Sequence, residues 1–227
     1  QVRALAGLRG FHRGYDWETA LLYSWAKVRD AQNSVSATMF EESVAKSTPD
    51  AYNPFGAFND QAATASVMYQ SVRKSRNTLL LWDFKASRPD LFKLPAGDAG
   101  IAFGVEAREE KQVDDRDSRV DGTITWKSIS GVEYPTDQYG VSPTPDTRGK
   151  RTVGGLYAEL YLPLVSPAQE IPLVRNLDMQ IAGRTEYYSD FGSVTKPKVA
   201  LGWEMFDGLG MRASYSQGFR APNLEQV

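Results

Sequence analysis

The chain contains no cysteine and a single histidine, His12. The lack of cysteine excludes a disulfide scaffold and a thiolate metal site. Lysine and arginine number 26 and aspartate and glutamate number 28, giving a formal net charge of −2, so no broad basic surface for nucleic acid is expected. No apolar run reaches the roughly eighteen residues of a membrane helix, and the mean hydropathy is −0.42. A membrane β-barrel remains open, because its strands carry apolar residues only at alternate positions.

The sequence also lacks the patterns of common catalytic sites. His12 lies beside Arg13 next to an expected turn, so a Ser-His-Asp triad would need distant partners. No phosphate-binding or dinucleotide-binding glycine pattern is present. The neighbouring carboxylates Glu109 and Glu110 would point to opposite faces of a strand, which does not suit a general acid and base pair. We therefore predict no enzyme and no cofactor.

One acidic stretch raises the question of calcium. Residues 114–121 contain four aspartates, followed by Gly122, and several oxygen ligands on a flexible loop suit this ion. The spacing does not fit an EF-hand, and Arg116 and Arg119 lie within the run. A solvated loop is the preferred interpretation, and calcium binding stays open.

What the chain does have is a long stretch of alternating side chains. Between residues 176 and 188 one face carries Leu177, Met179, Ile181, Gly183, Thr185 and Tyr187, and the other carries Asp178, Gln180, Ala182, Arg184, Glu186 and Tyr188. A helix would mix these two sets, whereas a strand separates them. The stretch is therefore predicted to be a β-strand with one apolar and one charged face.

The same alternation recurs along the whole chain. It is found at 2–10, 17–26, 79–86, 101–108, 156–162, 198–205 and 211–220. The segment 207–210, Asp-Gly-Leu-Gly, is typical of a tight hairpin turn between the last two of these. We predict an all-β chain of about eight antiparallel strands.

The connections between these strands fall into two kinds. Short or moderate links rich in Gly, Pro or Asp lie at 10–16, 88–98, 164–174 and 207–210. Long polar links lie at 31–75 and 114–150, and 189–195 is a short member of that second series. Short and long links alternate along the chain, which is the asymmetry of an outer-membrane barrel with short periplasmic turns and long extracellular loops.

Strand length and aromatic residues agree with a membrane barrel. A strand of about ten residues tilted near 45° spans roughly 24 Å of apolar band, and each expected strand is about that long. Aromatic residues near strand ends suit an interfacial girdle; they are Trp17, Trp25, Trp82, Tyr187 and Phe219. Alternation alone is equally compatible with a soluble β-sandwich. Sandwich strands average about five or six residues, however, and long loops are uncommon in compact soluble domains.

Three stretches near the end of the chain carry a family resemblance. They are 191–203, 209–215 and the run Gly218-Phe219-Arg220-Ala221-Pro222-Asn223-Leu224. They resemble the barrel of TonB-dependent outer-membrane receptors, in which a strand ending in Ser-x-Gly-Phe-Arg-Ala-Pro-x-Leu commonly follows one of the type Pro-Lys-x-Ala-x-x-Trp. The stretches 51–56 and 104–110 agree with the same family. The strand and loop rhythm extends the resemblance over essentially the whole chain.

The resemblance implies a receptor in the bacterial outer membrane that takes up a siderophore, cobalamin or an oligosaccharide. Its implied partners are outer-membrane lipid, a plug domain with the remaining barrel strands, the TonB complex through that plug, and a small-molecule nutrient. Residues 1–227 show no plug domain, no TonB-contacting box and no closing strand ending in an aromatic residue, so we expect a middle portion of a larger barrel. A passive small barrel or porin, and a soluble all-β ligand-binding module, are the alternatives.

Two sets of residues are candidates for function. On the polar strand faces, expected to line the lumen, are Glu106, Arg108, Glu159, Arg184, Glu186, Lys198, Glu204, Arg212 and Arg220. In the resembled fold they would pair with one another and with the plug. In the long loops, aromatic residues suited to stacking on a ligand, or simply to loop packing, are Tyr52, Phe55, Phe58, Trp126, Tyr134 and Tyr139.

Overall fold

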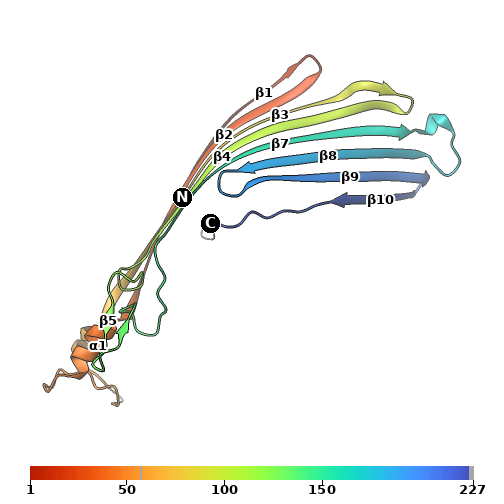
Figure 1. Cartoon of the computed structure of the whole chain (residues 1–227). Coiled ribbons are helices and arrows are strands. Elements are labelled where there is room, and N and C mark those ends of the chain that lie inside the picture. The colour runs from red at the N-terminus through yellow and green to blue at the C-terminus, as the bar shows by residue number, and fades with distance from the viewer. Residues whose placement is uncertain (57, 225–227) are drawn as a thin grey trace. The chain divides into compact units, whose positions relative to one another are not determined.

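A computed structural model describes residues 1–56 and 58–224 of the chain (Figure 1). Its main element is an eight-stranded sheet in which the strands follow the order β1-β2-β3-β4-β7-β8-β9-β10. The strands are β1 (Val2–His12), β2 (Tyr15–Val35), β3 (Met68–Leu94), β4 (Gly97–Asp115), β7 (Thr147–Val165), β8 (Asn176–Tyr188), β9 (Gly192–Phe206) and β10 (Leu209–Ser216). The predicted all-β antiparallel architecture with about eight strands is confirmed.

Several strands are longer than the ten residues expected. β2, β3, β4 and β7 have 21, 27, 19 and 19 residues. The alternation of apolar and polar residues marks only part of each strand, because elsewhere apolar and polar residues do not separate onto the two faces. The hydrogen-bonded ladder continues without that separation, so hydrophobic pattern alone underestimates strand length.

Contacts divide the chain into two compact units. Unit 1 consists of residues 1–25, 78–111 and 150 onward, and unit 2 consists of residues 26–77 and 112–149.

Tight turns set the strand register in unit 1. β1 and β2 pair from Val2↔Trp25 to His12↔Tyr15, leaving only Arg13 and Gly14 in the loop. Both loop residues have positive φ, 50° and 85°, as in the type I′ turn that suits the twist of a hairpin. The expected turn at 207–210 is likewise a two-residue loop, with Gly208 at φ 87° and a bulge at the start of β10.

The register keeps apolar side chains on one face of the sheet. Ile181 lies opposite Val199, and Met179 lies opposite Leu201. Ile181 and Leu201 are 41% and 39% exposed. Within the described part of unit 1, no second sheet covers this face. A β-sandwich would bury it, so the observed architecture differs from the soluble alternative.

Unit 2 contains short elements between the ends of long strands. They are α1 (Ala37–Val44), α2 (Gln61–Val67), β5 (Trp126–Lys127) and β6 (Glu133–Tyr134). Ser36 and Asp60 cap the two helices by accepting hydrogen bonds from the backbone N–H of Met39 (3.1 Å) and Ala63 (2.6 Å), as N-cap residues do. The two helices were not predicted within the long 31–75 link. Among the described residues, no helix has the length and apolar character needed to span a membrane.

Candidate functional site

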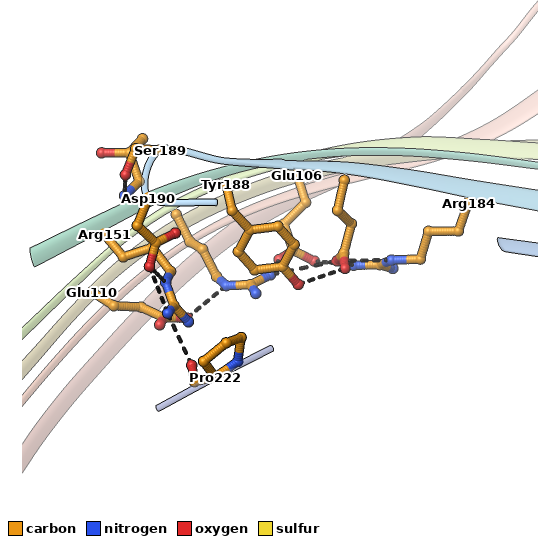
Figure 2. A network of polar contacts seen from close by, with 11 residues as sticks. Glu106, Glu110, Arg151, Arg184, Tyr188, Ser189, Asp190 and Pro222 are labelled. Atoms are coloured by element: carbon orange, nitrogen blue, oxygen red, sulfur yellow. Dashed lines mark hydrogen bonds and ion pairs between the residues drawn. The ribbon is translucent and has the colours of Figure 1, made fainter. Parts of the chain in front are cut away.

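The charged face of unit 1 carries a connected network of side chains from β4 and β8 (Figure 2). The guanidinium of Arg108 donates to Glu106 (2.5 Å) and to Glu110 (2.7 Å). Arg184 donates to Glu186 (2.6 Å) and to Glu106 (3.4 Å). The network therefore joins two strands that are not neighbours in the sheet, since β7 lies between them.

A glycine in β7 leaves the space for this bridge. A Cβ placed on Gly155 would lie 3.7 Å from Arg184 Nη2, from Glu106 Cβ and from Glu186 Cγ. These are ordinary van der Waals distances, so an alanine would fit there, but a longer side chain would extend into the space through which the β4 and β8 groups approach each other. The network thus depends on the period-two placement of charges and on a small residue between them.

A second cluster next to the network is built around Arg151 at the start of β7. Its side chain is only 4% exposed and bonds Asp190 through Nε (2.7 Å) and Nη2 (2.6 Å). Nη2 also donates to the carbonyl of Pro222 (2.9 Å). Figure 2 shows Arg151 pointing toward both partners. Because Pro222 lies beyond the last strand, this arginine ties the segment 217–224 to the sheet.

Aromatic rings complete the Arg151 cluster. Tyr188 and Phe191 stack with their centroids 4.3 Å apart, and Phe219 meets both rings at 6.0 and 5.7 Å. The Arg151 guanidinium lies 5.6 Å from the centroids of both Tyr188 and Phe191, within cation–π range. The Tyr188 hydroxyl donates to Glu186 (2.7 Å), so the aromatic cluster and the charge network are continuous.

The two clusters border a cavity of about 640 Å³, which is within the size range of small-molecule sites. Arg108, Arg184 and Glu186 lie in its lining with Phe219 and two lysines, Lys196 and Lys198. The Lys196 ammonium lies 6.0 Å from the Phe219 ring. Among the described residues neither lysine makes an ion pair. Among the described residues the cavity therefore presents both neutralised charges and ammonium groups without a carboxylate partner.

The structure distributes the nine predicted wall residues over several places. It brings Glu106, Arg108, Arg184 and Glu186 together in the network. Glu159 and Glu204 accept hydrogen bonds from Gln180 and Asn176 on β8. Lys198 lines the cavity, Arg212 lies on β10 beside two other hollows, and Arg220 lies in the segment that follows β10.

Sequence reasoning missed the Arg151 cluster. The link 114–150 was expected to lead directly to a strand near residue 156, whereas β7 begins at Thr147. The signal was present, because Arg151, Val153 and Gly155 continue the period of two from Tyr157. Glu110 was discounted as one of two adjacent carboxylates, yet the structure uses it as an acceptor for Arg108.

Unit 2 arranges most of the predicted loop aromatics in two groups. Trp126 and Tyr134 stack at 4.5 Å across the β5–β6 ladder, and the indole N–H of Trp126 donates to Glu41 (2.9 Å). Phe40 of α1 contacts both Tyr52 and Tyr139, at 5.6 and 5.7 Å.

The two loop phenylalanines and Tyr139 keep exposed surface. Phe55 and Phe58 are 97% and 92% exposed and Tyr139 is 60% exposed. Rings on the surface of unit 2 are thus accessible for contact with a ligand.

The 114–121 aspartates are engaged with protein donors. Asp114 is 2% exposed and receives bonds from Arg73 (2.7 and 2.8 Å), Ser75 (2.7 Å) and Arg116 (3.1 Å). Within the described residues no group of three His, Cys, Asp or Glu side chains is arranged to hold a metal ion. The stretch is therefore not a solvated loop at Asp114, whose carboxylate oxygens already have cationic partners.

Asp137 is the polar centre of unit 2. Its buried carboxylate accepts from Ser36 Oγ (2.6 Å), from the Thr38 backbone N–H (2.8 Å) and from the Arg119 guanidinium. Burial opposes ionisation, but these donors outweigh it and hold the pKa of Asp137 below its ordinary value of 3.8. The carboxylate thereby joins the start of α1 to the segment 117–139.

An antiparallel sheet with one uncovered apolar face and one charged face is typical of the wall of a transmembrane β-barrel. The chain belongs to the TonB-dependent receptor-like β-barrel family, whose model matches residues 6–227. This confirms the family resemblance of the sequence. Members of the family are nutrient receptors and transporters of the Gram-negative outer membrane. A comparison with curated proteins found no match.

Proposed function

We propose that the chain is part of an outer-membrane receptor that captures a scarce nutrient outside the cell and passes it inward with energy from the TonB complex. The observation that carries this proposal is the family match over residues 6–227. The charged face and the uncovered apolar face of unit 1 support it. In this account the chain supplies wall and loops, while a plug domain and the remaining strands come from outside residues 1–227.

The charged face is proposed to line the interior. Its ion pairs cost little in a water-filled lumen, whereas each charge on the lipid face would cost about 2 to 4 kcal/mol near the midplane. The network of Arg108 and Arg184 is largely neutralised from within unit 1. The free ammonium groups of Lys196 and Lys198 are the positions best suited to meet acidic groups of a plug.

Nutrient capture is proposed to involve the aromatic residues of unit 2. Exposed Phe55 and Tyr139 and the stacked pair Trp126 and Tyr134 present flat apolar surfaces beside hydrogen-bonding groups. Such surfaces suit stacking on a sugar, a catecholate or a corrinoid. The candidate nutrients are accordingly a ferric siderophore, cobalamin or an oligosaccharide.

Uptake by cells tests this function. Cells producing the full-length receptor are compared with cells lacking it, using labelled ferric siderophores, cobalamin and oligosaccharides, each with and without a functional TonB complex. We expect accumulation of one class only when both the receptor and TonB are present. Accumulation that does not depend on TonB would instead indicate a passive barrel, and the absence of the protein from the outer membrane would favour a soluble binding module.

A further inference from the structure

An aromatic hollow lies on the apolar face of unit 1 beside the Arg13-Gly14 turn. It has a volume of about 680 Å³, and Tyr15, Trp17, Phe84 and Phe103 contribute to its lining. Tyr15 and Phe103 meet edge to face with their centroids 6.2 Å apart. By the alternation of β2, Trp17 lies on the same side as Leu21 and Tyr23, so the hollow opens where unit 1 has no covering layer.

Two arginines lie at the rim of this hollow. Arg13 lines it directly, and the Arg88 guanidinium lies 5.7 Å from the centroid of the Tyr15 ring. Arg88 reaches the turn because Gly14 has no side chain: a Cβ there would lie 3.2 Å from Arg88 Cζ. Asp90 pairs with Arg88 at 3.0 Å. In the described residues the Arg13 side chain has no ion pair or hydrogen bond, so one guanidinium at this rim is uncompensated.

The backbone at Arg13 is costly for an arginine. Its φ of 50° is in the left-handed region, which non-glycine residues rarely adopt and where asparagine and glycine are favoured in type I′ turns. A residue held in a strained conformation is a reason to look for function. Here the strained residue places a free cation beside an apolar hollow.

We propose that this hollow is a binding site for an anionic glycerophospholipid, with an acyl chain against the aromatic rings and the phosphate at Arg13 and Arg88. The inference rests on the proposed function, because it requires the apolar face to be in a membrane. The hollow alone would suit any acyl chain, and the free cation alone any anion. Their juxtaposition at a short turn fits a molecule whose phosphate sits at the end of its chains, in the way that basic pockets hold lipid head groups.

The strain at Arg13 makes a clean test possible. Arg13→Asn removes the cation while giving the turn a residue that it favours, so the hairpin should be at least as stable as in the native protein. Native mass spectrometry of the full-length receptor, titrated with phosphatidylglycerol after delipidation, measures the retained lipid. We expect about fivefold weaker retention in Arg13→Asn, from the loss of one cation at the membrane surface, and near-native retention in Arg13→Lys.

Lys93→Gln is the matched control. This lysine lies near the next short turn, at 95–96 between β3 and β4, and is not part of the hollow. Three results would overturn the proposal. The first is that Arg13→Asn retains as much phosphatidylglycerol as the native protein, and the second is that Lys93→Gln loses as much as Arg13→Asn. The third is that the receptor retains lipid A in preference to phosphatidylglycerol. Failure of the receptor to fractionate with the outer membrane would instead count against the proposed function.

Discussion

At the scale of single residues, Arg151 is the charged side chain of unit 1 whose replacement we expect to destabilise the protein most. It is buried, it is paired with Asp190, and it holds the carbonyl of Pro222. The second carboxylate oxygen of Asp190, Oδ1, is buried without a hydrogen-bond partner among the described residues. Asp190 therefore depends on Arg151 for compensation of its charge.

Replacement of Arg151 by methionine should lower the free energy of unfolding by about 3 kcal/mol, because it leaves the largely buried carboxylate of Asp190 unpaired. Arg184→Met is the control: that side chain is 44% exposed, and exposed pairs are worth less than about 1 kcal/mol. Urea unfolding of the full-length receptor in lipid vesicles, followed by tryptophan fluorescence, gives both values. Equal losses in the two variants would show that Arg151 has no special role.

The ionisation of Asp137 makes the stability of unit 2 depend on pH. Since its pKa is depressed in the folded chain, its stabilising contribution is complete above the ordinary value of 3.8 and is lost as pH falls through the folded pKa. Amide protection factors at the start of α1, measured by hydrogen exchange and corrected for the intrinsic rate at each pH, should therefore be high at neutral pH and should fall below about pH 4. In Asp137→Asn the protection factors should already be lower at neutral pH and should change less with acid. An unchanged acid response in that variant would remove Asp137 from the explanation.

At the scale of secondary-structure elements, a charged side chain should destabilise the protein on one face of a strand and not on the other. On β8, Ile181 belongs to the apolar face, and its neighbour Gln180 donates to Glu159 on the charged face. An arginine at 181 would face lipid, whereas an arginine at 180 would face a carboxylate.

Ile181→Arg should therefore reduce the stability of the inserted protein by about 2 to 4 kcal/mol if the residue lies near the midplane, and Gln180→Arg should change it by less than about 1 kcal/mol. Folding yield into vesicles and urea unfolding measure the difference. Similar effects at both positions would mean that the two faces of β8 do not have different surroundings.

Strands were the part of the fold that the sequence predicted best. The alternation from Leu177 to Tyr188 identified β8 because apolar and charged residues separate cleanly. The extensions of β2 and β3 were missed because apolar and polar residues do not separate onto two faces there. The helices α1 and α2 were missed because they are short, although Ser36 and Asp60 are ordinary N-cap residues.

The sequence predicted which strand face carries the residues of the candidate site, but not which of their side chains contact one another. Period-two placement located Glu106, Arg108, Arg184 and Glu186 on polar faces. Their convergence requires β4 and β8 to flank β7 and requires a small residue at 155, and neither condition follows from a local pattern. The contact of Arg151 with Pro222 joins positions 71 residues apart, beyond the reach of any periodicity.

At the scale of the whole molecule, the chain forms part of a barrel wall. The family match fixes the class of protein, and the absence of a covering layer on the described apolar face of unit 1 agrees with a lipid environment. Under the proposed function, we expect the loop aromatics and the plug to determine which nutrient is bound.

The central claim is that alternate residues of the strands face lipid and a wet interior. It can be tested by single-cysteine spin labelling: residues 1–227 contain no cysteine, so only cysteines elsewhere in the full-length receptor would first be replaced. Labels are placed one at a time at residues 177–186 in the full-length receptor in lipid bilayers. Odd positions should collide readily with oxygen and poorly with a water-soluble nickel complex, and even positions should show the reverse. Equal access of the nickel complex to odd and even positions would contradict the account.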